Sequence, residues 1–452
     1  MIARGLDSSG NPKPIDFVAA SDSEVAAARK LREVLDRDGS EAPHFTLTAA
    51  SERYFRNPYE TADVSRLHFG SSEMRLEQLC DLVANRLMDD EEKVGPYVGV
   101  SGIALALFRA SQIFHGNVEF SKRLLAKSHE LQAATQKYRA SSKAALLYLL
   151  GECGFLTVNL LTGFDSAHAE NQLQELEKIG RTFSEDHSQM WDELFCGRCG
   201  FLAAALVLRQ EKRISIDTHL IQGVLHAIIR SGQAHARRSR SRSPLMFEYH
   251  GKEYFGAAHG LCGIVQMLLN FHDLLDSDQL QLLRGTINWL ATTQSADGNF
   301  PSSGGHIGES HHSLVHWCHG APGFALLFLS AHRVFGDQSY MAVMERALDC
   351  LWHRGMLRKG PGLCHGLSGN GYIFLLAYRF SGREEFFHKA RAFAVVMFSE
   401  QFQRLANTPD CPFSLFEGWA GAISFLADLL EPHKAQFPLY PIRDYSYLPE
   451  SL

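Results

Sequence analysis

The chain has 452 residues, of which 45% are hydrophobic, enough to bury a large core. Its 44 basic and 50 acidic residues give a net charge of −6, so no basic excess points to nucleic acid as a partner. No stretch reaches the ~18 uninterrupted apolar residues of a membrane span, and residues 1–40 lack the apolar core of a signal peptide. We therefore expect a cytoplasmic protein with no transmembrane segment, for which peripheral attachment to a membrane stays an open alternative.

Residues 1–51 precede the first recognisable element, and we expect them to form a tail of low order, with a helix over part of Ser21–Asp36 as an alternative. The main domain is predicted over residues 52–440, and residues 441–452 are expected to form a C-terminal tail. Within the domain, the Arg/Ser-rich stretch Arg237–Ser243 is interpreted as a solvated loop, with phosphorylation or docking as the alternative.

A Gly-x-x-Gly turn followed by an apolar run recurs through the domain, with first glycines 46 to 63 residues apart. The seven copies are Gly99/Gly102, Gly151/Gly154, Gly197/Gly200, Gly260/Gly263, Gly320/Gly323, Gly366/Gly369 and Gly418/Gly421. Similar turns at such a period indicate a repeat architecture. The runs that follow are rich in leucine and alanine and apolar nearly all round, which favours buried helices.

Amphipathic segments alternate with these buried helices, for example Leu76–Leu87, Met341–Trp352 and Glu385–Phe398. Seven pairs of one buried and one amphipathic helix predict an all-α fold, an (α/α)7 toroid of seven helical hairpins with the buried helices inside. An open solenoid is the alternative, but it would expose two ends and no polar capping repeat is evident.

Nine cysteines, an odd number in a chain without secretory features, favour reduced thiols and a metal site over disulfides. Cysteine, histidine and glutamate occupy equivalent positions before the glycines of four turns: Cys318-His319, Cys364-His365, His259 and Glu417. In a ring, equivalent positions converge on one end of the central cavity. Thiolates and imidazole are the ligands that zinc prefers. We therefore predict Zn²⁺ bound by Cys318, Cys364 and His365, with a fourth position open.

Other cysteines and histidines receive simpler interpretations. Cys196 and Cys199 form a Cys-x-x-Cys inside the third turn, where small packing residues are expected, because no second pair completes a zinc ribbon. The cluster His306, His311, His312 and His316 lies in a Gly/Ser-rich segment before the fifth turn and is interpreted as surface histidines, with a second metal cluster as the alternative.

Several longer motifs resemble the eukaryotic lanthionine synthetase C-like (LanC-like) family. They are Arg53-Tyr-Phe-Arg-Asn-Pro-Tyr59, Ser243-Pro-Leu-Met246, Ala257-Ala-His259-Gly-Leu, Val315-His-Trp-Cys318-His-Gly-Ala-Pro-Gly, Gly362-Leu-Cys364-His365-Gly and Pro412-Phe-Ser-Leu-Phe-Glu417-Gly. The resemblance covers about residues 53–440. It implies a seven-hairpin toroid with zinc on the three residues above, and glutathione as a ligand or co-substrate.

The resemblance also implies contacts with glutathione. It assigns them to Arg53, to Lys359 five residues before Cys364, and to the turn Asn407-Thr408-Pro409-Asp410. The family has arginine where this chain has Asn407, so a fixed cation and bidentate donor is lost and the glutathione pose is expected to differ.

The implied reaction adds a thiol to dehydroalanine or dehydrobutyrine residues in proteins or peptides. Only the thiolate attacks an alkene, and we expect His259 to protonate the resulting enolate, assisted by Glu193, while His319 orients a zinc ligand. Two alternatives stay open. One is a non-catalytic zinc- and glutathione-binding adaptor with signalling-protein partners. The other is a sugar hydrolase that uses carboxylates among Glu193, Asp410 and Glu417.

Overall fold

The computed structural model describes residues 46–67, 72–85, 95–135, 146–185, 190–308 and 314–444. The predicted helix within Ser21–Asp36, the histidines at 311 and 312, and the end of the C-terminal tail lie outside these residues. The described part is all-helical, with four isolated β-bridges in place of sheets. None of its helices combines the length and apolar character needed to cross a bilayer.

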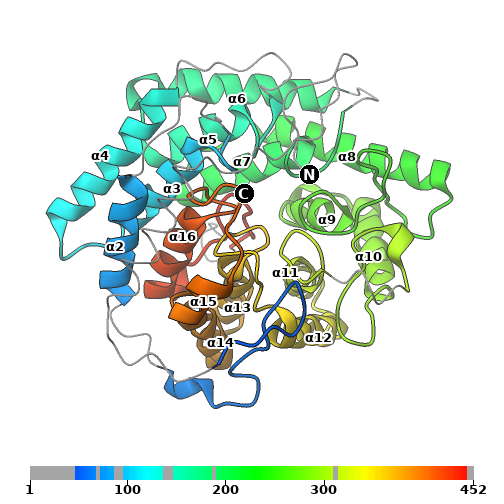
Figure 1. Cartoon of the computed structure of the whole chain (residues 1–452). Helices are drawn as coiled ribbons and strands as arrows, with labels where there is room; N and C mark the ends of the chain where they lie inside the picture. The colour runs from blue at the N-terminus through cyan, green and yellow to red at the C-terminus, as the bar shows by residue number, and fades with distance from the viewer. Residues whose placement is uncertain are drawn as a thin grey trace.

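Two concentric sets of helices form a ring (Figure 1). The inner set is α3 (Val100–Ser111), α5 (Glu152–Thr162), α7 (Arg198–Lys212), α9 (Leu261–Leu269), α11 (Ala321–Phe335), α13 (Leu367–Ser381) and α16 (Trp419–Leu430). The outer set is α2 (Ser72–Ala84), α4 (Val118–Thr135), α6 (Ala169–Ser184), α8 (Thr218–Ser239), α10 (Ser277–Ala291), α12 (Ser339–Arg354) and α14 (Glu384–Met397), followed by the short α15 (Glu400–Leu405). The predicted (α/α)7 toroid is confirmed.

Burial separates the two sets as the sequence pattern predicts. Every residue of α9 is buried, whereas only four residues of α10 are, and they face the ring through one stripe. Each inner helix packs against the next, and α16 packs against α3, so the ring is closed and the open solenoid is excluded.

The seven glycine turns meet at one end of the ring through a circle of backbone hydrogen bonds. Each inner helix is capped by the first glycine of its turn, and the circle runs through the residue two positions earlier. These residues are Tyr97, Leu149, Phe195, Ala258, Cys318, Cys364 and Phe416. The amide N–H of each residue donates to the carbonyl oxygen of its counterpart in the next turn, at 2.8 to 3.4 Å. Between the third and fourth turns the donor is the N–H of Leu194, next to Phe195, and it bonds the oxygen of Ala258. The N–H of Phe416 donates to the oxygen of Tyr97 at 3.1 Å and completes the circle.

The second glycine of each turn is required by a close backbone contact. A Cβ at any of the seven would lie 1.8 to 2.6 Å from the carbonyl oxygen six residues earlier in its own turn. At Gly102 that oxygen belongs to Pro96, at 2.1 Å. Because real Cβ atoms do not approach backbone this closely, any other residue would push the turn out of the circle.

The opposite end of the ring is filled by the segment Ala435–Asp444, which follows α16. Its apolar side chains Phe437, Leu439, Tyr440 and Ile442 are buried. The ring of Phe437 stacks on Trp317, beside Cys318, with centroids 5.0 Å apart. The centre of the toroid is therefore a packed core, and packing continues four residues beyond the expected boundary at 440.

Ion pairs hold this segment to the ends of the inner helices. Arg109 at the end of α3 bonds Asp428 of α16 at 2.9 Å and the carbonyl oxygen of Gln436 at 3.0 Å. Arg379 bonds Asp444, and both side chains are less than a tenth exposed. Buried charges of this kind are costly unless paired, so these contacts fix where the segment lies.

The Arg/Ser-rich stretch is only partly the predicted loop, because its first three residues, Arg237–Ser239, are helical and Arg240–Ser243 form the loop. The helix α8 continues through Ser239, and Arg240 ends it in the left-handed conformation at φ 53°. Arginine is a good helix former, no proline intervenes before Pro244, and cations at a helix C-terminus are favoured by the helix dipole.

Replacing Gly102 by alanine tests the close contact. We expect Gly102→Ala to lower the free energy of unfolding by about 3 kcal/mol or more, because the added methyl group cannot be accommodated. The matched control is Gly116→Ala, where a Cβ would meet nothing within 4 Å and a change within about 1 kcal/mol is expected. Chemical denaturation measures both. Equal stabilities of the two variants would show that the turn backbone can move apart.

Candidate functional site

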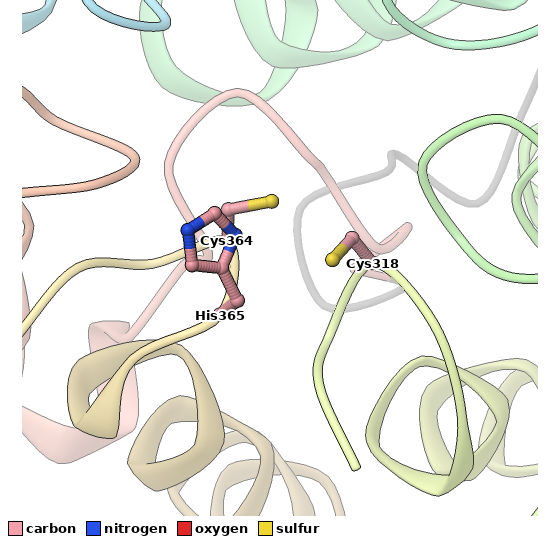
Figure 2. Close-up of side chains that lie close together, drawn as sticks. All are labelled: Cys318, Cys364 and His365. Atoms are coloured by element: carbon pink, nitrogen blue, oxygen red, sulfur yellow. The ribbon is translucent and has the colours of Figure 1, made fainter. Parts of the chain in front are cut away.

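Two neighbouring turns of the circle bring Cys318, Cys364 and His365 together. The N–H of Cys318 donates to the carbonyl oxygen of Cys364 at 3.4 Å, so the fifth and sixth turns are in direct contact. The two sulfurs and a ring nitrogen of His365 lie within 4.8 Å of one another. Figure 2 shows the Cys364 sulfur pointing across toward the Cys318 turn.

The chemistry of this three-residue cluster fits a metal ion. Both cysteines are buried free thiols. Burial and the neighbouring Cys318 thiol raise the pKa of Cys364 well above its ordinary value, while His365 acts in the opposite direction. Two adjacent buried thiols can both ionise only beside a cation, and two sulfurs with one imidazole form a donor set for a borderline-soft divalent metal.

The seven turns meet at one end of the ring, which we call the mouth. The residue directly before the first glycine of each turn determines which side chains lie there. In order of the turns these residues are Val98, Leu150, Cys196, His259, His319, His365 and Glu417. The first two turns are apolar and the remaining five carry polar or titratable groups. These polar and titratable residues are therefore confined to one arc of the circle. The arc includes Cys318, Cys364 and His365, which we call the metal-binding cluster for the ion that they could hold.

His259 is held by Glu193 of the preceding turn. Its Nδ1 lies 2.7 Å from Glu193 Oε2, and the same carboxylate accepts the backbone N–H groups of Phe195, at 2.9 Å, and of Cys196. An ionised carboxylate can only accept a hydrogen bond, so Nδ1 of His259 carries the proton in this contact. The other nitrogen, Nε2, is left as the atom that can give or take a proton. The structure thus brings together the two residues predicted to act as acid and assistant.

His319 lies between His259 and the metal-binding cluster, with its ring centroid 6.4 Å from that of His259. Burial, and secondarily the charge of His259, lower the pKa of His319 to about 3. Its Nδ1 is buried without a hydrogen-bond partner among the described residues. The lowered pKa keeps the His319 imidazole neutral at neutral pH.

The interpretation of His316 as a surface histidine is wrong. It is 8% exposed, and its ring centroid lies 6.0 Å from that of His365. The turn folds back on itself because the N–H of His316 donates to the oxygen of His319 at 3.0 Å, which carries the side chain inward. Burial and the cationic groups around it, including Lys359 and Arg53, lower its pKa well below the ordinary value. His306, by contrast, is only partly buried and bonds Ser302 and Ser303.

The residues assigned to glutathione through the resemblance converge beside the sixth turn. The N–H of Arg358 donates to the oxygen of Arg53 at 2.9 Å, and the N–H of Asn407 donates to the oxygen of Arg358 at 2.7 Å. Three separate segments thus meet around Lys359. Arg53, Lys359, Asn407, Thr408 and Asp410 are exposed, and Pro409 is half-buried.

A small pocket of about 20 Å³, room for about one water molecule, lies between Gly360–Pro361 and the turn Asn407–Pro409. Gly360 lines it at φ +122°, where a Cβ would lie 2.8 Å from Pro409. Glycine next to Lys359 therefore lets the two loops close on each other.

Sequence reasoning missed the aromatic residues beside His259. Tyr249 stacks parallel on the imidazole, with centroids 4.9 Å apart and 3° between the planes, and Tyr254 lies 6.2 Å from it. They lie outside the glycine turns, in a loop with no repeat signal. The dipeptide His250-Gly251 between alternating aromatic residues was the available sign of a hairpin.

Comparisons with known proteins agree with this geometry. Residues 91–442 match the family model described as lanthionine synthetase C-like protein. The chain is 33% identical over 388 residues to "Glutathione S-transferase LANCL1" of Danio rerio, covering 83% of this chain and 92% of that protein. The solved structure of nisin cyclase has the same fold, with a TM-score of 0.59 at 19% identity over 79% of this chain and 93% of that chain. This chain therefore belongs to the lanthionine synthetase C-like family.

Proposed function

We propose that this protein adds glutathione to dehydroalanine or dehydrobutyrine residues of proteins or peptides, with zinc held by Cys318, Cys364 and His365. The observation that carries the proposal is the placement of a two-sulfur, one-nitrogen cluster and a His259–Glu193 pair on consecutive turns of one circle. The name of the Danio rerio relative, a glutathione S-transferase, supports the choice of thiol.

The reaction is an addition and needs no oxidant or reductant. The thiol S–H adds across the Cα=Cβ bond, so that sulfur bonds to Cβ and a proton reaches Cα. Zinc at the cluster would supply the positive charge that lowers the pKa of the glutathione thiol, making its thiolate available at neutral pH.

The chain's own residues would bind glutathione and provide the proton. The exposed cations Arg53 and Lys359, both close enough to lower the pKa of His316, would pair with the carboxylates of glutathione. Asn407 offers only a neutral amide in place of the family's arginine, so the pose rests more heavily on these two cations. His259 would donate from Nε2 to Cα, while Glu193 holds Nδ1 and stabilises the imidazolium before the transfer.

A non-catalytic adaptor is the second candidate. It would share the metal and glutathione sites but would not need the His259–Glu193 pair. Turnover therefore separates the two.

Cys318→Ala tests the metal-binding cluster. We expect about one zinc per chain in the purified protein and loss of most of it in the variant, since two remaining ligands hold the ion poorly. The matched control is Cys196→Ala, a cysteine that lines the same mouth but lies outside the cluster. Elemental analysis of both proteins measures the effect. A full complement of zinc in Cys318→Ala would refute the ligand assignment.

His259→Asn tests the proton donor. We expect it to keep zinc and glutathione but to form the adduct with a dehydroalanine peptide roughly 10²-fold more slowly, the usual contribution of a general acid. Mass spectrometry over time gives the rate, and His433→Asn, an exposed histidine near the opposite end of the ring, is the control. An unchanged rate in folded, zinc-loaded His259→Asn would remove the residue from the mechanism. No adduct with the wild-type protein would favour the adaptor.

A further inference from the structure

A tight hairpin projects between α8 and α9 beside the mouth of the ring. Tyr249 and Lys252 exchange both backbone hydrogen bonds, at 2.9 and 3.1 Å. The two residues between them, His250 and Gly251, have φ of +50° and +71°. Two consecutive left-handed residues define a type I′ turn, which fixes the direction of the flanking side chains. Few residues other than glycine adopt this conformation, and histidine is among those that tolerate it best; contacts around His250 also hold it at the tip.

Those contacts are aromatic. The Trp191 ring lies 4.6 Å from both Tyr249 and His250, and Tyr249 lies 4.3 Å from His250. Tyr254, on the return strand of the hairpin, lies 6.4 Å from Tyr249. We call these four residues, Trp191, Tyr249, His250 and Tyr254, the aromatic wall.

The aromatic wall extends from the surface to His259, the proposed proton donor. His250 is exposed, Trp191 and Tyr254 are partly exposed, and Tyr249 is buried. Tyr249 stacks on His259, and Tyr254 approaches both His259 and His319, at 6.2 and 5.8 Å. A flat group lying against the exposed rings would thus sit next to the imidazole that is proposed to supply the proton.

The wall and the cationic residues lie on different sides of the metal-binding cluster. The order of turns in the circle is His259, then His319 and Cys318, then Cys364 and His365. The wall flanks the fourth turn, whereas Lys359 and Arg53 flank the sixth. Two ligands could therefore approach the cluster from opposite sides without competing for the same side chains.

We propose that the aromatic wall binds the acceptor, a peptide segment that carries the dehydroamino acid; this rests on the proposed function. A dehydroamino acid residue is flat because its double bond is conjugated with the adjacent carbonyl, and its alkene side chain carries no charge. Flat π groups pack well on aromatic faces and edges. Glutathione, with two carboxylates, matches the cations on the other side instead. The preferred acceptor has neutral, apolar or aromatic neighbours around the dehydroamino acid.

The test measures two affinities in each variant. The probes are glutathione alone and a fluorescently labelled neutral peptide with one dehydrobutyrine, each added separately to zinc-loaded protein. We expect Trp191→Leu and Tyr254→Leu to weaken peptide binding about tenfold, the size of a lost aromatic anchor, and to leave the Kd for glutathione within about twofold. Lys359→Ala should weaken glutathione binding and leave the affinity for the peptide unchanged. Tyr54→Leu, which removes a partly exposed aromatic ring from the cationic side, is the matched control and should leave peptide binding unchanged.

Folding and turnover separate the outcomes. Each variant is first checked for a wild-type melting temperature, and Trp191→Phe should restore most of the peptide affinity if an aromatic face is what matters. Unchanged peptide affinity in both leucine variants would overturn the wall as the acceptor site, even if the wild-type protein forms the adduct. A wild-type protein that binds the peptide at the wall but forms no adduct would instead contradict the proposed reaction. Failure of the wild-type protein to bind the peptide would overturn both.

Discussion

The circle of backbone hydrogen bonds between the seven turns is the constraint on which the rest of the structure depends. It can form only if the turns approach closely, and the second glycines allow that approach, since a Cβ would run into a carbonyl oxygen of its own turn. Once the circle is closed, residues at one repeat position become spatial neighbours. Cys318 and Cys364, 46 residues apart in sequence, therefore stand in direct contact and bring His365 with them.

Asymmetry within this symmetric frame gives the site its chemistry. At the position before the first glycine the first two turns carry Val98 and Leu150, whereas the arc from Cys196 to Glu417 holds thiols, imidazoles and a carboxylate. The segment Ala435–Asp444 packs into the opposite end of the ring, and its Phe437 stacks on Trp317 beneath the turns. The cluster thus lies where the turns meet, over a packed core.

The repeat made much of this predictable from sequence. Glycine spacing predicted the helix starts, and the equivalent placement of Cys318, Cys364 and His365 predicted their convergence, because both follow from local chemistry repeated at a fixed position. What lies outside the repeat was harder. His316 turns inward through a hydrogen bond within its own turn, and residues 441–444 are ordered by ion pairs with α13 and with the segment after α9. The aromatic wall depends on contacts between Trp191 and a hairpin nearly 60 residues away. None of these has a periodic signal.

The central claim is that ring closure makes a metal site from two neighbouring turns. Zinc-edge X-ray absorption of the purified protein tests it most directly, because it counts the donor atoms around the metal. The account predicts two sulfurs at about 2.3 Å and one imidazole nitrogen at about 2.0 Å, with a lighter atom completing the shell. A shell of four sulfurs, or one without sulfur, would contradict it.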